Sequence, residues 1–184
     1  MSSPRRATAS ECIARFSCRL TPEHVGPELQ RQVGRALIDT VGVALAGHGE
    51  AVSRSVWRYG VSTCGAQVAA RIGAGPWGRR ERWPAEAAAL YNGVAGHVLD
   101  FDDVTSPLRG HPSIALLPPL VALAQERDLP GSRLASAYVV GFEVMVRLAR
   151  AMVHDHYAKG WHATTTLGTV GSAVACCHLL GLSE

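Results

Sequence analysis

The sequence is poor in aromatic residues and contains almost no lysine. Only 6% of its 184 residues are aromatic, although 47% are hydrophobic, and Lys159 is its one lysine. The hydrophobic residues are therefore mostly alanine, leucine and valine, and 19 glycines accompany them. Small aliphatic residues favour closely packed helices over an aromatic-rich β-sandwich. We therefore predict an all-α fold, with one helical domain over residues 8–184.

Runs of like charge are also missing. The chain has 18 basic and 15 acidic residues, a formal net charge of +3, and both kinds are spread along its length. A nucleic-acid-binding protein usually concentrates its basic residues on one segment or face. We therefore expect no nucleic-acid partner.

The five cysteines lack the spacing of a disulfide framework or a metal centre. They form no CxxC pair, and two of them are adjacent. Neighbouring residues on a helix point in different directions, so Cys176 and Cys177 are not placed to bind one ligand together. We expect no disulfide framework, zinc site or iron–sulfur cluster.

We also expect no secretory signal, because Glu11 and Arg15 interrupt the N-terminal region where such a signal needs an apolar stretch. Residues 162–183 lie in the longest segment without Asp, Glu, Lys or Arg. Their histidines, threonines and serines make the segment too polar for an isolated membrane span, whereas a helix buried among other helices tolerates them. We expect a cytoplasmic protein with no membrane partner.

Hydrophobic periodicity and turn residues predict a series of helices. Gly47 stands where a left-handed residue would end the second helix. The pair Pro118-Pro119 is expected to kink its helix or to start a new turn. The chain ends after an apolar helix without a polar tail, which is typical of a truncated domain. The predicted helices cover residues 10–19, 27–46, 50–60, 84–99, 111–125, 130–152 and 164–180, and residues 61–83 combine a short β-like stretch with a loop.

Three segments place polar groups at the ends of these apolar helices. Pro112 in a first helical turn puts His111 near the N-cap, where free backbone amides and the helix dipole favour anions. His162 holds the corresponding position before the last helix. Two such helix starts, with a lysine near one of them, would suit a substrate with several carboxylates. The segments are His97 with Asp100, Asp102 and Asp103; His111-Pro112-Ser113; and Lys159-Gly160-Trp161-His162.

Each segment also has an ordinary structural interpretation. A DxDD sequence after a helix is typical of a solvated turn, and a His-Pro pair is often only a helix start. A lysine on a loop is normally solvated. The DFDD aspartates could instead bind Mg²⁺ as in isoprenoid synthases, but that chemistry needs a second Asp-rich motif. The sequence contains none.

Taken in order, the motifs resemble those of the MmgE/PrpD family of 2-methylcitrate dehydratases and cis-aconitate decarboxylases. The combination of NGxxxHxxDFDD, then HPS, then GWHxT is the most specific part of this resemblance. The matching stretches are LIDTVGVALAG (37–47), AAALYNGVAGHVLDFDDV (87–104), HPSIALLPPLVALA (111–124), GSRLASAYVVGFEVMVRLAR (131–150) and KGWHATTTLGTVGSAVACCHLLGLS (159–183).

The resemblance implies a helical domain joined to a smaller α/β lid domain, usually in a homodimer, with a cofactor-free active site between the two. It implies lyase chemistry on small di- and tricarboxylates. The family's active-site positions correspond to Asp100, His111 and His162, which we predict to be catalytic, and we predict that His111, His162 and Lys159 bind substrate. A further catalytic lysine and a further histidine of the family lie beyond residue 184. Val104 stands where some members have a threonine.

Dehydration of a 2-hydroxy-tricarboxylate needs a base, an acid and positive charge for the carboxylates. Histidine performs either proton transfer near neutral pH. We assign His162 to proton transfer or carboxylate contact, His111 to carboxylate binding and Asp100 to orienting a histidine or exchanging a proton. The two histidines could exchange these roles. The three segments should then meet on one side of the molecule.

Our leading hypothesis is an N-terminal part of such a lyase, without metal or cofactor and impaired on its own. The alternatives are a non-catalytic remnant, a dimerisation module, and one half of a split enzyme. The expected partners are a small di- or tricarboxylate and either further copies of the chain, in a homo-oligomer, or a downstream-encoded second half.

Overall fold

The computed structural model describes residues 5–63, 69–70, 82–152 and 155–183, and these residues are predominantly helical. The two short strands, β1 (Ala69–Ala70) and β2 (Arg82–Trp83), pair antiparallel. The all-α prediction is confirmed. The helices are α1 (Ala9–Arg19), the 3₁₀-helix η1 (Pro22–His24), α2 (Pro27–Gly47), α3 (Ala51–Thr63), α4 (Ala85–His97), α5 (Pro112–Glu126), α6 (Gly131–Met152), α7 (Asp155–Ala158) and α8 (Ala163–Leu180).

The N-terminal helices begin at residues suited to the first turn. The Thr8 hydroxyl accepts the N–H of Glu11, and the Glu11 carboxylate accepts the N–H of Thr8. This capping box satisfies two amides that the helix itself leaves unpaired. Pro27 begins α2, where its fixed φ suits the first turn.

Gly47 does not end α2 in the left-handed conformation that the sequence predicts. It is the last helical residue of α2, and the C-cap that follows, His48, is right-handed, so no left-handed glycine ends this helix. Gly47 instead allows α2 and α4 to approach each other, because a Cβ atom on it would lie 2.1 Å from the carbonyl oxygen of Ala95. Its small size is therefore used for packing and not for a turn.

The long helix α5 passes through Pro118 and Pro119 without a break, so the new turn predicted as one option at this pair is absent. The predicted loop at residues 61–83 lies largely outside the described residues. In the described part of that region, α3 continues to Thr63 and the two short strands follow.

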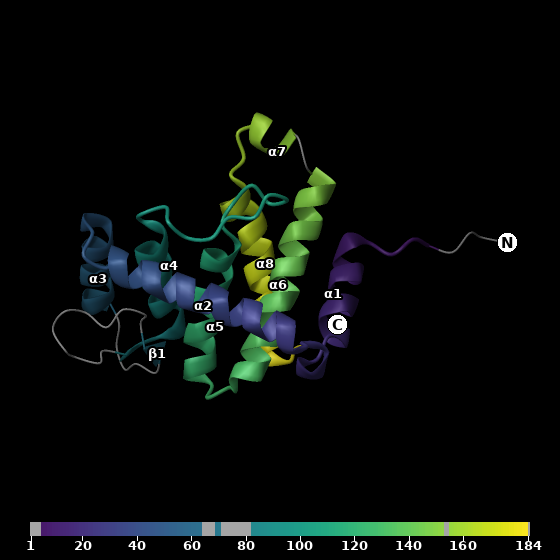
Figure 1. The fold of residues 1–184 in the computed structure, drawn as a ribbon, viewed down its shortest axis with the longest axis horizontal. Coiled ribbons are helices and arrows are strands. Elements are labelled where there is room, and N and C mark those ends of the chain that lie inside the picture. Colours follow the sequence, from purple (N-terminus) through teal and green to yellow (C-terminus); the bar gives the residue numbers. More distant parts are fainter. Residues whose placement is uncertain (1–4, 64–68, 71–81, 153–154, 184) are drawn as a thin grey trace.

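The helices pack so that α8 lies against α5, α6 and α1, and the pair formed by α6 and α8 is the most extensive. Helix α2 crosses in front of α4, α5 and α6 (Figure 1). Among the described helices, α8 alone is long and apolar enough to span a membrane by length and composition. Core helices of soluble proteins share that property, and Leu167, Ala175 and Leu179 of α8 belong to the main hydrophobic core.

His178 joins α8 to two other helices. Its Nδ1 lies 2.9 Å from the carbonyl oxygen of Ser17 in α1, and its Nε2 lies 3.1 Å from the Ser136 hydroxyl in α6. Burial lowers the pKa of His178 below its ordinary value of 6.5, against the opposing effect of the Ser17 hydrogen bond. The neutral imidazole is therefore the form that the fold favours.

We expect this histidine to make the protein less stable in mild acid. Because the pKa is lower in the folded state, the stabilisation is complete above pH 6.5 and is lost progressively as the pH falls toward the lowered folded pKa. Thermal unfolding at about pH 7.5 and about pH 5 measures this loss. His178→Gln should reduce the difference between the two melting temperatures, whereas His24→Gln, at an exposed position in η1, should leave it unchanged. An equal difference in wild type and His178→Gln would contradict the assignment.

Candidate active site

The segment after α4 turns the DFDD carboxylates toward the start of α5. Asp100 has a φ of 56°, and its N–H donates to the carbonyl oxygen of His97 at 2.9 Å. Aspartate is one of the few residues that adopt this left-handed conformation without a large cost. A single antiparallel bridge between Thr105 and Gly110 then closes the following loop. The chain thereby returns to His111 directly beside the aspartates.

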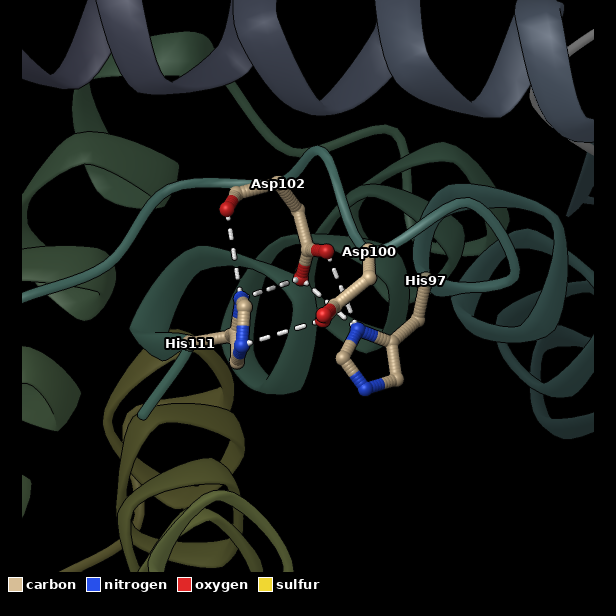
Figure 2. Close-up of side chains that lie close together, drawn as sticks. All are labelled: His97, Asp100, Asp102 and His111. Atoms are coloured by element: carbon tan, nitrogen blue, oxygen red, sulfur yellow. Dashed lines mark hydrogen bonds and ion pairs between the residues drawn. The ribbon is translucent and has the colours of Figure 1, made fainter. Parts of the chain in front are cut away.

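Four side chains meet at this point, and Figure 2 shows them: His97, Asp100, Asp102 and His111. Each residue offers one ring nitrogen or carboxylate oxygen, and these four atoms lie within 4.8 Å of one another. Asp102 is at the centre, with both carboxylate oxygens 3.0 Å from Nδ1 of His97 and one of them 3.3 Å from Nδ1 of His111. Nε2 of His111 lies 3.3 Å from Asp100. The structure thus brings two of the predicted catalytic residues, Asp100 and His111, into contact.

The side chains of the cluster differ in how much of each is exposed to solvent. The Asp102 side chain is fully buried, the His111 side chain is 15% exposed, and the Asp100 side chain is 77% exposed. The two imidazole rings pack edge to face, with their centroids 4.9 Å apart. A proton on Nε2 of His111 therefore has a path to the solvent side through Asp100.

The four residues also form a donor set that could bind a divalent cation, with two imidazole nitrogens and two carboxylates. Such mixed sets suit transition metals, whereas Mg²⁺ prefers oxygen ligands alone. The set therefore does not favour the magnesium chemistry of the isoprenoid-synthase alternative. The same atoms already pair with one another, so a cation would have to replace these contacts.

Asp103 turns away from this cluster and caps α5. One of its carboxylate oxygens accepts the backbone N–H of Ser113 at 3.1 Å, and the other accepts the Ser113 hydroxyl. The Ser113 hydroxyl also lies 2.7 Å from the Tyr138 hydroxyl. Burial raises the pKa of Asp103, against the effect of the Ser113 hydrogen bonds, and raises the pKa of Tyr138 to about 12. The Ser113 amide, which the sequence suggested was open to an anion, is occupied by this carboxylate.

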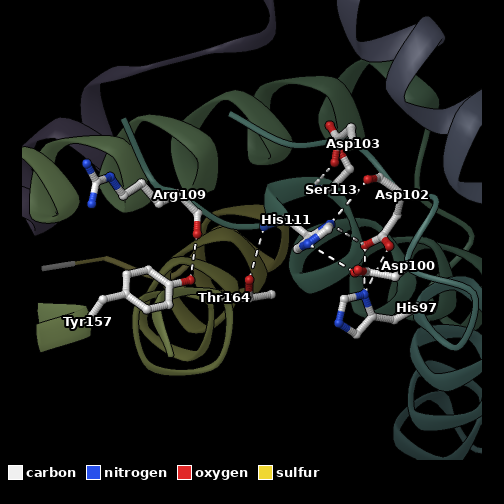
Figure 3. Close-up of polar contacts among 9 residues, drawn as sticks. All are labelled: His97, Asp100, Asp102, Asp103, Arg109, His111, Ser113, Tyr157 and Thr164. Carbon is white, nitrogen blue, oxygen red and sulfur yellow. Dashed lines mark hydrogen bonds and ion pairs between the residues drawn. The ribbon is translucent and has the colours of Figure 1, made fainter. Parts of the chain in front are cut away.

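The residues on either side of the GWH segment connect it to the cluster through their side chains. The N–H of His111 donates to the Thr164 hydroxyl at 3.0 Å, and the Tyr157 hydroxyl donates to the carbonyl oxygen of Arg109 (Figure 3). Gly110 permits this approach, since a Cβ atom there would lie 2.6 Å from the Thr164 hydroxyl oxygen. The three predicted segments are therefore neighbours in the fold.

His162 is the N-cap of α8 and is exposed. Its Nδ1 lies 3.2 Å from the Thr165 hydroxyl, and its ring meets Tyr157 edge to face. Within the described residues it makes no hydrogen bond with Asp100 or His111. Lys159 is exposed on the loop before α8.

Grooves flank the cluster without enclosing it. One, with a volume of about 780 Å³, lies between α2 and α6 and is lined in part by Asp103 and Val104. Another, of about 390 Å³, lies behind the loop that contains Arg109 and is lined in part by Tyr157. Neither of these two grooves is lined by Asp100, His111 or His162. The Asp100 side chain, which is 77% exposed, forms the outer edge of the cluster.

Sequence reasoning gave no role to three residues that the structure places at the site. His97 and Asp102 were noticed only as polar neighbours of Asp100, and Thr164 only as a residue after GWH. The fixed spacing of NGxxxHxxDFDD contained the signal for the first two, because its histidine and the second aspartate of DFDD meet once the loop turns.

The family model of the MmgE/PrpD N-terminal domain matches residues 11–184. The chain belongs to the MmgE/PrpD family. The family resemblance inferred from the motifs is thereby confirmed, and the motif segments around Asp100, His111 and His162 all lie within the matched MmgE/PrpD domain.

Curated relatives of this MmgE/PrpD chain include cis-aconitate decarboxylases. The chain is 34% identical over 182 residues to that of Mus musculus, a match that covers 96% of this chain and 36% of the relative. It is also 34% identical over 167 residues to that of Homo sapiens, covering 88% and 34%. A cis-aconitate decarboxylase-like protein, oryM of Aspergillus oryzae, is 34% identical over 114 residues, covering 58% and 24%. The chain spans about a third of the length of the mouse and human proteins.

Proposed function

We propose that this chain carries the helical, acid–base part of a lyase that acts on small di- or tricarboxylates by dehydration or decarboxylation. Membership of the MmgE/PrpD family and the cis-aconitate decarboxylase relatives support this class of reaction. The observation that carries the proposal is the position of His111 between the buried Asp102 and the exposed Asp100. A histidine held by two carboxylates is suited to taking up and releasing a proton.

Both reactions need one group that exchanges a proton with a carbon atom. In dehydration, a base removes the proton next to a carboxylate, and the hydroxyl leaves as water after an acid donates a proton to it. In decarboxylation, a carbon–carbon bond breaks, carbon dioxide leaves, and an acid supplies a proton to the carbon. We assign the proton exchange to His111 and Asp100, and substrate carboxylate contact to His162 and Lys159.

We further propose a cytoplasmic protein that works as a homo-oligomer or with a separately encoded second half. Exposed apolar side chains support association: Ile38 in α2 is 75% exposed, and Phe101 and Val104 beside the cluster are 73% and 67% exposed. Val170 and Leu180 of α8 are also exposed, at 41% each. The same surface favours the second candidate function, a dimerisation module without catalysis.

We expect cis-aconitate or 2-methylcitrate to bind beside His111 and His162 and to shift the imidazole signals of both in nuclear magnetic resonance spectra of the labelled chain. A carboxylate within contact distance changes the electrostatic environment of each ring. The titration should saturate, and His178 at the far end of α8 should serve as an internal reference that does not move.

Two variants make this test specific. His162→Gln should weaken binding, whereas His24→Gln, which changes an exposed histidine in η1, should not. Binding that leaves the His111 and His162 signals unchanged would refute the site. The absence of any saturable shift would favour the non-catalytic dimerisation module.

A further inference from the structure

Asp102 is a buried carboxylate that is held by two histidines. Its side chain has no exposed surface, so water does not satisfy its four lone-pair positions. A buried carboxylate without partners would be strongly destabilising. Its observed partners are Nδ1 of His97, at 3.0 Å from both oxygens, and Nδ1 of His111, at 3.3 Å from one of them.

The chemistry of these partners fixes where the imidazole protons lie. An ionised carboxylate only accepts hydrogen bonds, and so does a backbone carbonyl. Nδ1 of His111 faces both kinds of acceptor, because it also lies 3.2 Å from the carbonyl oxygen of Asp102. Nδ1 of His97 faces both carboxylate oxygens. Each Nδ1 must therefore carry a hydrogen for these contacts to be favourable.

The opposite nitrogen of each ring is then the one free to exchange a proton. Nε2 of His97 points away from the carboxylates (Figure 2), and Nε2 of His111 faces Asp100 at 3.3 Å. The contact between His111 and Asp100 is favourable when one proton lies between the two atoms. That proton can pass from Nε2 to an Asp100 oxygen or to a bound substrate, which leaves His111 neutral and Asp102 ionised.

We propose that Asp102 is a positioning residue that holds both His97 and His111 with Nδ1 protonated and thereby directs Nε2 of His111 toward Asp100 and the open side of the site. Asp103 is not suited to this task because Ser113 occupies both of its oxygens. Asp100 is not suited either, because its side chain is mostly exposed. The catalytic meaning of this arrangement rests on the proposed function, but the proton positions do not.

Long-range nitrogen–proton correlation spectra of the ¹⁵N-labelled chain test the proposal directly. At about pH 8.5, where an ordinary histidine is neutral, both His97 and His111 should show a protonated Nδ1. A tie between the loop and α4 through His97 alone would leave the proton position on His111 unconstrained. An unprotonated Nδ1 on His111 would overturn the proposal.

Asp102→Asn changes the acceptor set while preserving size. An amide offers one oxygen and one NH₂ group in place of two oxygens, so at least one of the two histidines should change from a protonated Nδ1 to a protonated Nε2. Asp128→Asn is the matched control, because Asp128 is exposed and asparagine tolerates its φ of 51°. Unchanged proton positions in folded Asp102→Asn would overturn the proposal, and if that variant fails to fold, the wild-type spectrum still decides it.

The result is separable from the proposed function. Protonated Nδ1 atoms on both rings together with no binding of cis-aconitate or 2-methylcitrate would support the role of Asp102 and count against the lyase. Saturable binding together with an unprotonated Nδ1 on His111 would support the lyase and overturn the role of Asp102. Where binding occurs, the proton positions should persist in the bound state, and a switch of His111 to a protonated Nε2 with a bare Nδ1 would overturn the proposal.

Discussion

Gly47→Ala should lower the free energy of unfolding by roughly 2–3 kcal/mol, in the upper part of the range for overpacked sites. The added Cβ would lie 2.1 Å from the carbonyl oxygen of Ala95 and 2.7 Å from a methyl carbon of Val98. The carbonyl belongs to the backbone of α4, so it cannot rotate away as the end of a flexible side chain can. The two helices must therefore separate. Urea unfolding followed by circular dichroism measures the effect.

Gly42→Ala is the matched control in the same helix. A Cβ on Gly42 meets no atom within 4 Å, and the residue lies within α2. Alanine there should raise the free energy of unfolding by about 0.5–1 kcal/mol, because it restricts the unfolded chain and suits a helix. Equal stability of the two variants would show that α2 and α4 do not approach as closely as the structure places them.

The same contact should affect the candidate site. Ala95 and Val98 lie on either side of His97, the first residue of the four-residue cluster. A shift of α4 away from α2 would move His97 relative to Asp102, where the two contacts are 3.0 Å. Loss of stability in Gly47→Ala should therefore come with altered nuclear magnetic resonance signals of the His97 imidazole, whereas Gly42→Ala should leave these signals unchanged.

Gly47 also shows where the sequence was sufficient and where it was not. The periodicity of apolar residues predicted α2 within one residue at its C-terminal end, because the pattern depends on one helix and its buried face. The role of the glycine depends on a second helix that lies about fifty residues later in the chain. A local pattern contains no information on such a distance, so the turn interpretation was the only one available from the sequence.

The candidate site, too, could be predicted only in part from the sequence. The order of the DFDD, HPS and GWH motifs identified the segments, and the structure makes these segments neighbours through Thr164. The partners within them were not predictable, because they depend on the left-handed conformation of Asp100 and on the course of the loop to Gly110. That loop sends Asp102 toward the histidines and Asp103 toward the end of α5. The roles of Asp100, His111, His162 and Lys159 in a reaction remain predictions.

Turnover of cis-aconitate or 2-methylcitrate by the 184-residue chain alone should be negligible. The Asp100 side chain is 77% exposed, so water competes for the proton that the site would transfer, and a site that excludes water strengthens acid–base chemistry. We propose that a downstream-encoded second half, where the genome encodes one, restores turnover when it is added in trans or fused to this chain, measured as carbon dioxide release or alkene absorbance.

In that restored state, His111→Ala should reduce turnover by roughly 10²–10⁴-fold, the range for loss of a general acid or base. The reason is that His111, alone among the described residues, pairs with both the buried Asp102 and the exposed Asp100. His24→Ala, at an exposed position in η1, should leave turnover unchanged. Robust turnover by the chain alone that is lost in both His111→Ala and His162→Ala would support the site but overturn the proposed impairment. Turnover that survives both substitutions would refute the acid–base assignment itself, because no proton would then need to pass through the pair that links Asp102 to the open side of the cluster.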